Sequence, residues 1–544
     1  MFSGRRNENR LHLSRGSATI QSPERVRELE NAQEPVIRPI AKAYPSVALL
    51  LFFVGGLAIA PIWLVANPPL LDYPNHLARS FVLAHLHDPA LPFHQFYSAD
   101  WGLYPYLAMD VSLLWLQRFL PIELAGSVFL SFCVLAVPLS AWFFLHQANP
   151  GQDHLALWTL LLCHNVFFLY GFLNFYFSLA LCFLALGLWL QWLAKPRAIL
   201  WCLVSLTLTA LYFTHLVGFG IAGLLVTAYC VLARRTIGEI LFSWLLFVPG
   251  ALFLLYWWRL GAGPTTQLAF HSFMEKVKYL SVIAQGYSTR LDQFTLLALA
   301  GFSLAAWWRN PNFRWNYRWL GVAAGLFGAY WVLPWSAGEG TFLDIRVLPM
   351  LFVLLLTVAR IGPRGWRLAP LAVLIFVART ANVAQTFVSS QLQLAGLARS
   401  FSITAPNVRV LPIVEADDEE LTKHPFAHFW AYGVIRRGWF SPYLFNLKGV
   451  MPLRIEYDGY SPDGFWGLDY EESPDWARVQ KDYDYVWAYN VSRFSDSLET
   501  IGELVYEYGD LEVYRLNKFH GEFSESTPDK KKADSSVARS SKAH

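Results

Sequence analysis

The sequence predicts a polytopic α-helical membrane protein, and three observations support this class. Only 15% of its 544 residues are charged and 55% are hydrophobic, whereas soluble domains carry about 25% charged residues. The apolar residues gather in runs of roughly 20 residues, the length that crosses a bilayer as a helix. All five cysteines lie inside these runs, so we expect neither a disulfide framework nor a zinc site built from cysteines.

The polar start of the chain and the apolar runs after it define the first two parts. Residues 1–43 are polar and rich in arginine, and we interpret them as a cytoplasmic tail. The first apolar run is longer than the core of a signal peptide, so we expect a retained helix. The apolar runs lie at residues 46–66, 123–146, 155–170, 172–194, 198–214, 216–233, 237–258, 293–308, 319–335, 346–362 and 368–387. We therefore expect about 11 transmembrane helices within residues 44–387.

The positive charges between these runs indicate the orientation. Cytoplasmic connections of membrane proteins are enriched in Lys and Arg. With the N-terminus inside, four of the five inner connections are basic, carrying Lys195, Arg197, Arg234, Arg235, Arg309, Arg314, Arg318, Arg364 and Arg367. The opposite, outer face then holds residues 67–122, 170–175, 213–218, 259–292 and 338–346.

The first outer loop, residues 67–122, contains a further apolar stretch at 105–119. Asp110 and Gln117 interrupt this stretch and are seven residues apart, which places them on one helical face. We therefore expect an interfacial helix rather than a span, with Asp110 on its polar face. Counting the stretch as a span would reverse every later loop and put most arginines outside.

After the last run the chain becomes polar, and we expect residues 388–520 to form a small α/β domain outside the membrane. Three short runs have strand-type composition, at 408–415, 483–489 and 511–516. The tryptophans in "HFWAYG" and "GFWGLDY" could stack on sugar rings, but we interpret them as domain core. Residues 521–544 are polar and poor in apolar side chains, so we expect a disordered tail.

Polar residues that carry chemistry collect on the predicted outer face. The stretch "LLDYPNHLARSF" places Asp72, His76 and Arg79 at positions i, i+4 and i+7, which share one face if a helix begins near Pro74. Asn174, His215, Asp344 and Arg346 lie in the other outer segments. Ionisable residues next to the apolar zone are costly and often functional.

Each of these residues also has an ordinary interpretation. Asp72 could cap a helix, Arg79 could extend to lipid headgroups, and Arg346 could be an interfacial anchor. His215 and Asn174 could satisfy or shape helix breaks. The loop residues His85, His87 and Asp88 could bind a metal, but no third ligand has the spacing that a helix would fix, so we do not expect a metal there.

The order of these parts resembles the GT-C superfamily of integral membrane glycosyltransferases. In sequence the resemblance rests on "LLDYPNHLAR", "GFLNF", "FTHLVGF" and "FLDIRVLP". It implies a sugar donor on a polyprenyl phosphate, held in a groove open to the bilayer, and an inverting displacement. By this resemblance Asp72 is the general base, and Arg346 binds the donor phosphate. Arg79 or His76 could assist, which only their position on the same helical face suggests. Asn174, His215 and Asp344 complete the predicted pocket.

The chain departs from the superfamily at one point. Several members carry paired acids in this loop and bind a divalent metal, whereas Tyr73 and Pro74 follow Asp72 here. Asp100 and Asp110 could supply a second acid only if the loop folds back. We therefore expect no cofactor and do not favour a divalent metal.

These observations predict a glycosyltransferase on the periplasmic face of a bacterial inner membrane. Its partners would be a polyprenyl-phosphate-linked sugar, a glycan, lipid or protein acceptor and membrane lipid, but no nucleic acid. Two alternatives are a transporter or flippase of a lipid-linked substrate and a non-catalytic envelope scaffold. A transporter predicts internal repeats and charges within the spans; we find no repeat, and the runs contain few charges.

Overall fold

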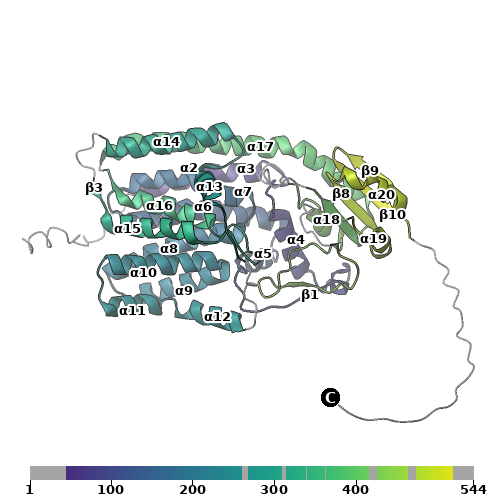
Figure 1. The fold of residues 1–544 in the computed structure, drawn as a ribbon, viewed down its shortest axis with the longest axis horizontal. Coiled ribbons are helices and arrows are strands. Elements are labelled where there is room, and N and C mark those ends of the chain that lie inside the picture. The colour runs from purple at the N-terminus through teal and green to yellow at the C-terminus, as the bar shows by residue number, and fades with distance from the viewer. Residues whose placement is uncertain are drawn as a thin grey trace, which may run out of the picture. The chain divides into compact units, whose positions relative to one another are not determined.

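A computed structural model describes residues 45–259, 268–308, 314–338, 340–361, 363–415, 426–462 and 473–518. The chain from Pro45 onward forms one compact unit, built from a bundle of helices and a smaller mixed α/β part (Figure 1). The tails predicted at 1–43 and 521–544 lie outside the described residues.

All eleven predicted apolar runs are helical along most of their length. The first run is divided into α2 (Pro45–Gly56), η1 (Leu57–Ile59) and α3 (Ala60–Trp63). The next helices are α6 (Ile122–Ala148), η3 (Asp153–Leu162), α7 (Val166–Leu169), α8 (Leu173–Ala194), α9 (Ala198–Thr214) and α10 (Leu216–Leu232). They are followed by α11 (Ile237–Leu245), α12 (Val248–Arg259), α14 (Thr289–Trp307), α15 (Tyr317–Val332), α16 (Leu348–Val358) and α17 (Ala369–Ile403).

Helix length decides how many of these helices qualify as membrane spans on their own. Among the described residues, three are long and apolar enough: Ile122–Ala148, Leu173–Ala194 and Gly365–Ile403. A fourth qualifies if α11 and α12, bent by 59° at their junction, form one span. Five shorter apolar helices of 10–17 residues accompany them. The number of about 11 crossings therefore stays a prediction.

Residues 67–122, predicted as the first outer loop, contain two helices that precede α6. The helix predicted after Pro74 is α4 (Tyr73–Ala84), and the stretch at 105–119 forms α5 (Ala108–Leu116). At 9 residues, α5 is too short to cross a bilayer. Between them lie η2 (Phe93–Gln95) and the short strand β1 (Tyr97–Ala99).

The C-terminal part is built on a four-stranded sheet in the order β6-β8-β10-β9. The three predicted strands correspond to β6 (Val410–Val414), β8 (Tyr485–Tyr489) and β10 (Leu511–Leu516), and β9 (Gly502–Tyr508) was not predicted. β6 runs parallel to β8, and the other pairs are antiparallel. Pro412 is tolerated because β6 is an edge strand. The helices here are α18 (Ala431–Arg437), α19 (Trp476–Asp482) and α20 (Ser495–Ile501).

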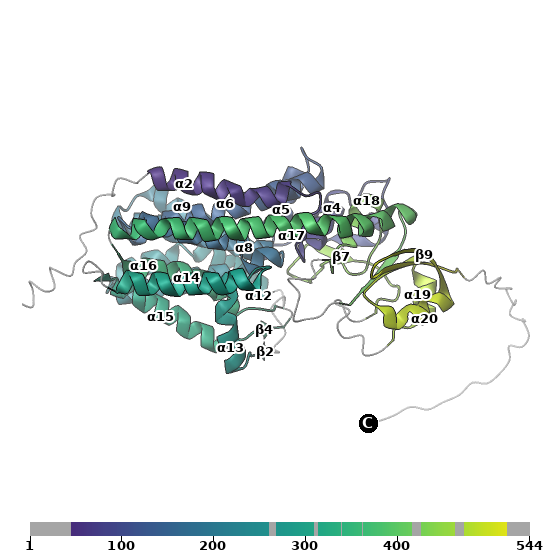
Figure 2. The same ribbon diagram turned by 90° about the horizontal axis from the view of Figure 1, so that it is seen from above.

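The C-terminal part is joined to the rest of the unit at several places. The long helix α17 reaches the sheet (Figure 2), where Trp487 donates from its indole to Ser400 Oγ at 3.0 Å. Strand β7 (Leu453–Ile455) pairs antiparallel with β1 of the first outer loop. Helix α18 of the C-terminal part also packs against α4.

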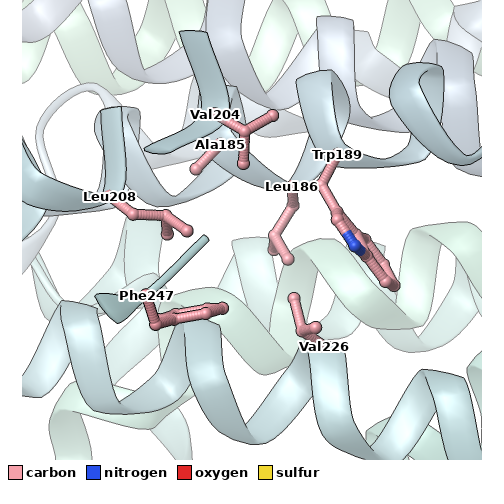
Figure 3. Close-up of a pocket in the computed structure, with 7 residues that line it drawn as sticks. All are labelled: Ala185, Leu186, Trp189, Val204, Leu208, Val226 and Phe247. Atoms are coloured by element: carbon pink, nitrogen blue, oxygen red, sulfur yellow. The ribbon is translucent and has the colours of Figure 1, made fainter. Parts of the chain in front are cut away.

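One apolar crevice lies between α8, α9 and α10, far along α8 from Asn174. It is lined by Ala185, Leu186, Trp189, Val204, Leu208, Val226 and Phe247 (Figure 3). None of these side chains is ionisable, so the crevice has no group for acid–base chemistry.

Candidate active site

The segment before α4 is fixed by the segment between α7 and α8. The backbone N–H of Leu71 donates to Leu169 O at 3.2 Å, and that of Asp72 donates to Tyr170 O at 3.0 Å. Gly171 has φ +75°, and a Cβ atom there would lie 2.8 Å from the nitrogen of Tyr73. Glycine is required because the two backbones approach this closely.

Asp72 sits at the N-cap position of α4, but its side chain makes no capping hydrogen bond. The residue is 6% exposed, and its Oδ1 atom has no hydrogen-bond partner among the described residues. Burial raises the pKa of Asp72 to about 8, and the charge of Arg346 opposes this rise. A buried carboxyl that does not cap its helix is unusual for a purely structural role.

Arg346 lies in η5 (Ile345–Val347), directly before α16. Its guanidinium packs over the rings of Phe172 and Phe175, at 5.2 and 5.1 Å from their centroids. Its Nε atom is buried without a hydrogen-bond partner in the described part of the chain. A guanidinium carries five donors, so this site keeps donor capacity for an anion.

His215 lies between α9 and α10 and contacts Arg346. Its Nδ1 accepts from the backbone N–H of Val217 at 3.2 Å, which caps α10. Its Nε2 is in hydrogen-bond contact with Nη1 of Arg346. A neutral imidazole accepts at one nitrogen only, so the helix cap and Arg346 compete for His215. Arg346 is therefore incompletely satisfied by its protein neighbours.

Asp344 is fully buried two residues before Arg346. Its Oδ1 accepts from the N–H of Ile345 at 2.8 Å. Its Oδ2 lies 2.9 Å from His271 Nδ1 and 3.2 Å from Lys276 Nζ. These contacts occupy the carboxylate and tie the start of η5 to the segment around α13 (Phe273–Tyr279).

Arg79 is already paired with a carboxylate. It is fully buried, and its Nε and Nη2 atoms donate to the two carboxylate oxygens of Asp110 at 3.0 and 2.9 Å. Ser80 Oγ donates to the same carboxylate. Gln117 also contacts Ser80, so the predicted polar face of α5 packs against α4 and Asp110 is buried on it. The phosphate-binding role of Arg79 stays a prediction, with its guanidinium already engaged.

Asn174 holds the loop that leads into α5. Its Oδ1 accepts from the N–H of Met109 at 3.0 Å, and its Nδ2 donates to Tyr106 O at 2.8 Å. Tyr106 has φ +69°, and its ring meets that of His215 edge-on at 4.5 Å. Asn174 thus fixes a strained loop beside the Arg346 contact rather than only shaping its own helix.

His76 faces the C-terminal part of the chain. The residue is 8% exposed, its Nδ1 has no hydrogen-bond partner among the described residues, and its ring lies 4.8 Å from that of Phe445. Burial and the nearby charge of Arg79 lower the pKa of His76 well below its ordinary value. His76 is therefore neutral near pH 7 and can act as a hydrogen-bond donor or acceptor.

Two residues of this pocket were not singled out in the sequence. His428 places Nε2 at 3.6 Å from Oδ1 of Asp72, and Nδ2 of Asn75 lies 3.2 Å from Nδ1, the other ring nitrogen. His428 belongs to "HFWAYG", which the aromatic content marked as core. Asn75 stands in the opening of α4, where the i, i+4 and i+7 pattern does not select it.

The described residues contain no group of three His, Cys, Asp or Glu side chains that could hold a metal ion. His85 and Asp88 make local contacts instead: His85 Nδ1 lies 3.0 Å from Phe81 O, and Asp88 Oδ1 accepts from Ala90 N at 2.9 Å. Asp100 pairs with Arg454 at 2.9 Å. The expectation that no metal is required stays a prediction.

Comparison with known proteins places this geometry in a known fold. No protein-family model matches the sequence, and no curated protein is similar to it in sequence. Two crystal structures of ArnT from Cupriavidus metallidurans are similar, one in the apo state with a TM-score of 0.51 and one bound to undecaprenyl phosphate with 0.50. Each is 11% identical and covers 86% of this chain and 96% of its own. At 11% identity this likeness shows that the chain has the fold of ArnT, in line with the predicted architecture.

Proposed function

We propose that this chain, which has the GT-C fold, is a membrane glycosyltransferase that takes its sugar from a polyprenyl-phosphate donor. The proposal includes the predicted setting, a bacterial inner membrane with the Asp72 pocket and the C-terminal part on the periplasmic side. One observation carries it. Asp72 is buried and Arg346 is half-buried, the charge of Arg346 acts on Asp72, and each side chain keeps a polar atom without a hydrogen-bond partner among the described residues. A carboxyl and a guanidinium with such atoms left over suit a substrate that supplies both a proton and an anion.

Asp72 is the proposed general base. It would accept the proton of an acceptor hydroxyl while the hydroxyl oxygen attacks the anomeric carbon of the donor. The bond from that carbon to the phosphate oxygen breaks in the same step, and the polyprenyl phosphate leaves with the bonding electron pair. This single displacement inverts the anomeric centre.

Arg346 is the proposed phosphate ligand. The leaving phosphate gains negative charge as the bond breaks, and a guanidinium placed beforehand stabilises that charge. The guanidinium lies over the rings of Phe172 and Phe175, and such packing leaves donors at its edge for oxygen atoms. The fold supports this assignment, since one ArnT structure is bound to undecaprenyl phosphate.

His215, Asn174 and Asp344 are proposed to position these two groups rather than to react. His215 contacts Arg346, Asn174 fixes the loop of Tyr106 beside His215, and Asp344 anchors the start of η5. Arg79, which is paired with Asp110, is assigned to the packing of α4 on α5.

The first test compares surface glycans of cells that carry wild type, Asp72→Asn or Arg346→Ala, analysed by mass spectrometry at equal protein abundance. We expect one defined sugar to be lost in both variants. Arg379→Ala is the matched control, because Arg379 is a buried arginine paired with Asp292 on α17 and α14. Unchanged glycans in Asp72→Asn would overturn the proposal.

A second test measures binding of undecaprenyl phosphate to the purified full-length chain in detergent micelles by native mass spectrometry. We expect Arg346→Ala to weaken binding at least about tenfold, the loss of one charge-assisted contact of roughly 1.5–3 kcal/mol, and Arg379→Ala to bind as wild type. Lipid binding that survives together with unchanged glycans in Asp72→Asn would favour the transporter or scaffold.

A further inference from the structure

His428 reaches the pocket of Asp72 from the C-terminal part of the chain. It precedes α18 and is 2% exposed, with its Nε2 atom 3.6 Å from Oδ1 of Asp72. The imidazole is enclosed by the rings of Phe445 and Trp430, at 5.2 and 6.1 Å. Its position is fixed by contacts to a segment more than 350 residues away in sequence, since Asn75 and His428 are 353 apart.

The contacts of Asn75 determine which nitrogen of His428 carries the proton. Oδ1 of Asn75 accepts from the N–H of Phe445 at 2.9 Å, and Nδ2 donates to Tyr443 O at 3.0 Å. These two partners fix the orientation of the amide. Nδ2 also lies 3.2 Å from Nδ1 of His428. An amide NH₂ group only donates, so Nδ1 of His428 is the acceptor.

The protonation state of His428 follows from burial. Desolvation lowers the pKa of His428 to about 3, which keeps the ring neutral near pH 7. A neutral imidazole that accepts at Nδ1 carries its one hydrogen at Nε2. That hydrogen is on the nitrogen that faces Asp72.

We propose that His428 is a positioning residue that donates its Nε2 hydrogen to Asp72 and thereby favours the ionised carboxylate. The inference deepens the proposed function, because it assigns a partner to the proposed base. At 3.6 Å the contact is longer than a hydrogen bond, and a shortening by about 0.6 Å would form one. This contact joins the C-terminal part to the Asp72 pocket.

The same geometry excludes a proton relay from Asp72 through His428. Nε2 already carries a hydrogen, and Nδ1 is occupied by the amide of Asn75, so the neutral ring has no free lone pair for the proton of Asp72. No proton moves in the proposed contact. His428 acts by stabilising one charge state, as donors to a carboxylate do.

Among the described residues, the ionisable groups that act on this pair are Arg346, whose charge acts on Asp72, and His76, which interacts electrostatically with His428. Arg79 acts on His76 but is neutralised by Asp110. Arg346 therefore also favours the carboxylate, and its contribution must be held constant while His428 is changed.

The test reads the ionisation of Asp72 from protein stability and needs no sugar donor. A carboxyl whose pKa is higher in the folded than in the unfolded protein lowers the stability of the protein as the pH rises. The loss begins near pH 4, the pKa in the unfolded chain, and becomes constant above the pKa in the folded protein. The melting temperature of full-length wild type is therefore compared with that of Asp72→Asn from pH 4 to pH 10. The difference should grow with pH and level off near pH 8.

The comparison between the chain with Asp72 and the Asp72→Asn variant is then repeated in two further backgrounds, with the His428 substitution present in both proteins of the pair. His428→Phe keeps a ring but has no donor, and His428→Gln keeps a donor. We expect His428→Phe to move the levelling point upward by about one pH unit, and His428→Gln to move it by less. His428→Leu is a second variant without a donor. His164→Phe is the control, because His164 is a buried imidazole that contacts Ala58 O rather than a carboxylate; it should leave the levelling point in place.

Three results would overturn the inference: an unchanged levelling point in both donor-free variants, a downward shift, or an equal shift for phenylalanine and glutamine. The outcome is separable from the proposed function. If the shift is found and glycans are unchanged in Asp72→Asn, the His428 contact stands and the glycosyltransferase does not. If glycans are lost in Asp72→Asn and the levelling point does not shift, the glycosyltransferase proposal stands and the His428 contact does not.

Discussion

A Cβ atom at Gly171 would lie 2.9 Å from the backbone nitrogen of Asp72. The two residues are also joined through the neighbouring peptide, since Asp72 N–H donates to Tyr170 O at 3.0 Å. The position of the proposed base is thus set by the backbone of a distant segment. Because Gly171 also precedes Phe172, the ring under Arg346, one short turn aligns both charged groups.

Gly171→Ala is expected to displace this turn. The left-handed φ of +75° costs an alanine roughly 1–2 kcal/mol, and the new methyl group must in addition push the backbone of Asp72 away. We expect a lower melting temperature and loss of the sugar that depends on Asp72.

Gly151→Ala separates these two effects. Gly151 has φ +81° but open space where a Cβ atom would be, so it carries the backbone cost without the contact. If Gly171→Ala and Gly151→Ala changed glycans and melting temperature equally, the close approach of Gly171 to the backbone of Asp72 would not matter for either.

The ion pair of Arg79 and Asp110 is expected to be structural. Both side chains are 0% exposed, so removal of one partner leaves a buried charge and costs roughly 3–5 kcal/mol. We expect Arg79→Met and Asp110→Leu each to lower the melting temperature strongly, and the double substitution to cost much less than their sum. A double-mutant cycle with additive losses would contradict the pairing.

The sequence predicted that four segments would come together, because the basic residues of the other connections assigned these four to the same face. The segments are residues 67–122, 170–175, 213–218 and 338–346. The structure joins them through Tyr170 and Asp72, Phe172 and Arg346, and His215 and Arg346. The three strand-type runs were also correctly located, since alternation and β-branched composition are local signals.

The charge pattern of the connections could not predict which side chain contacts a given ionisable residue. Helical spacing placed Asp110 and Gln117 on one face of their own helix, but it did not predict that Arg79, 31 residues away, would pair with Asp110 and bury it. His428 carries no local signal either. Its segment is aromatic and buried, and its contact with Asp72 depends on how the chain after α17 packs on α4.

Asp344 is expected to act as an anchor for η5 and not as a group facing the substrate. Lys276 is 3% exposed and depends on this carboxylate, so Asp344→Asn leaves a buried cation without its counter-charge. We expect Lys276→Met and Asp344→Asn to reduce undecaprenyl-phosphate binding similarly, and the double variant to be no worse than Asp344→Asn. If Lys276→Met bound the lipid normally while Asp344→Asn did not, Asp344 would contact the ligand directly.

The proposed base also predicts the pH dependence of sugar transfer. Asp72 must be ionised to accept a proton, and burial raises its pKa to about 8 in the empty protein. The value of kcat/KM reports the free enzyme, so it should rise about tenfold per pH unit below pH 7 and level off above pH 8. The product to monitor is the sugar lost from Asp72→Asn cells, with transfer measured in membranes between pH 5 and pH 10. A profile that is flat from pH 5 to pH 9 would mean that the ionisation of Asp72 does not limit transfer, and Asp72 would then be a buried polar residue rather than the base.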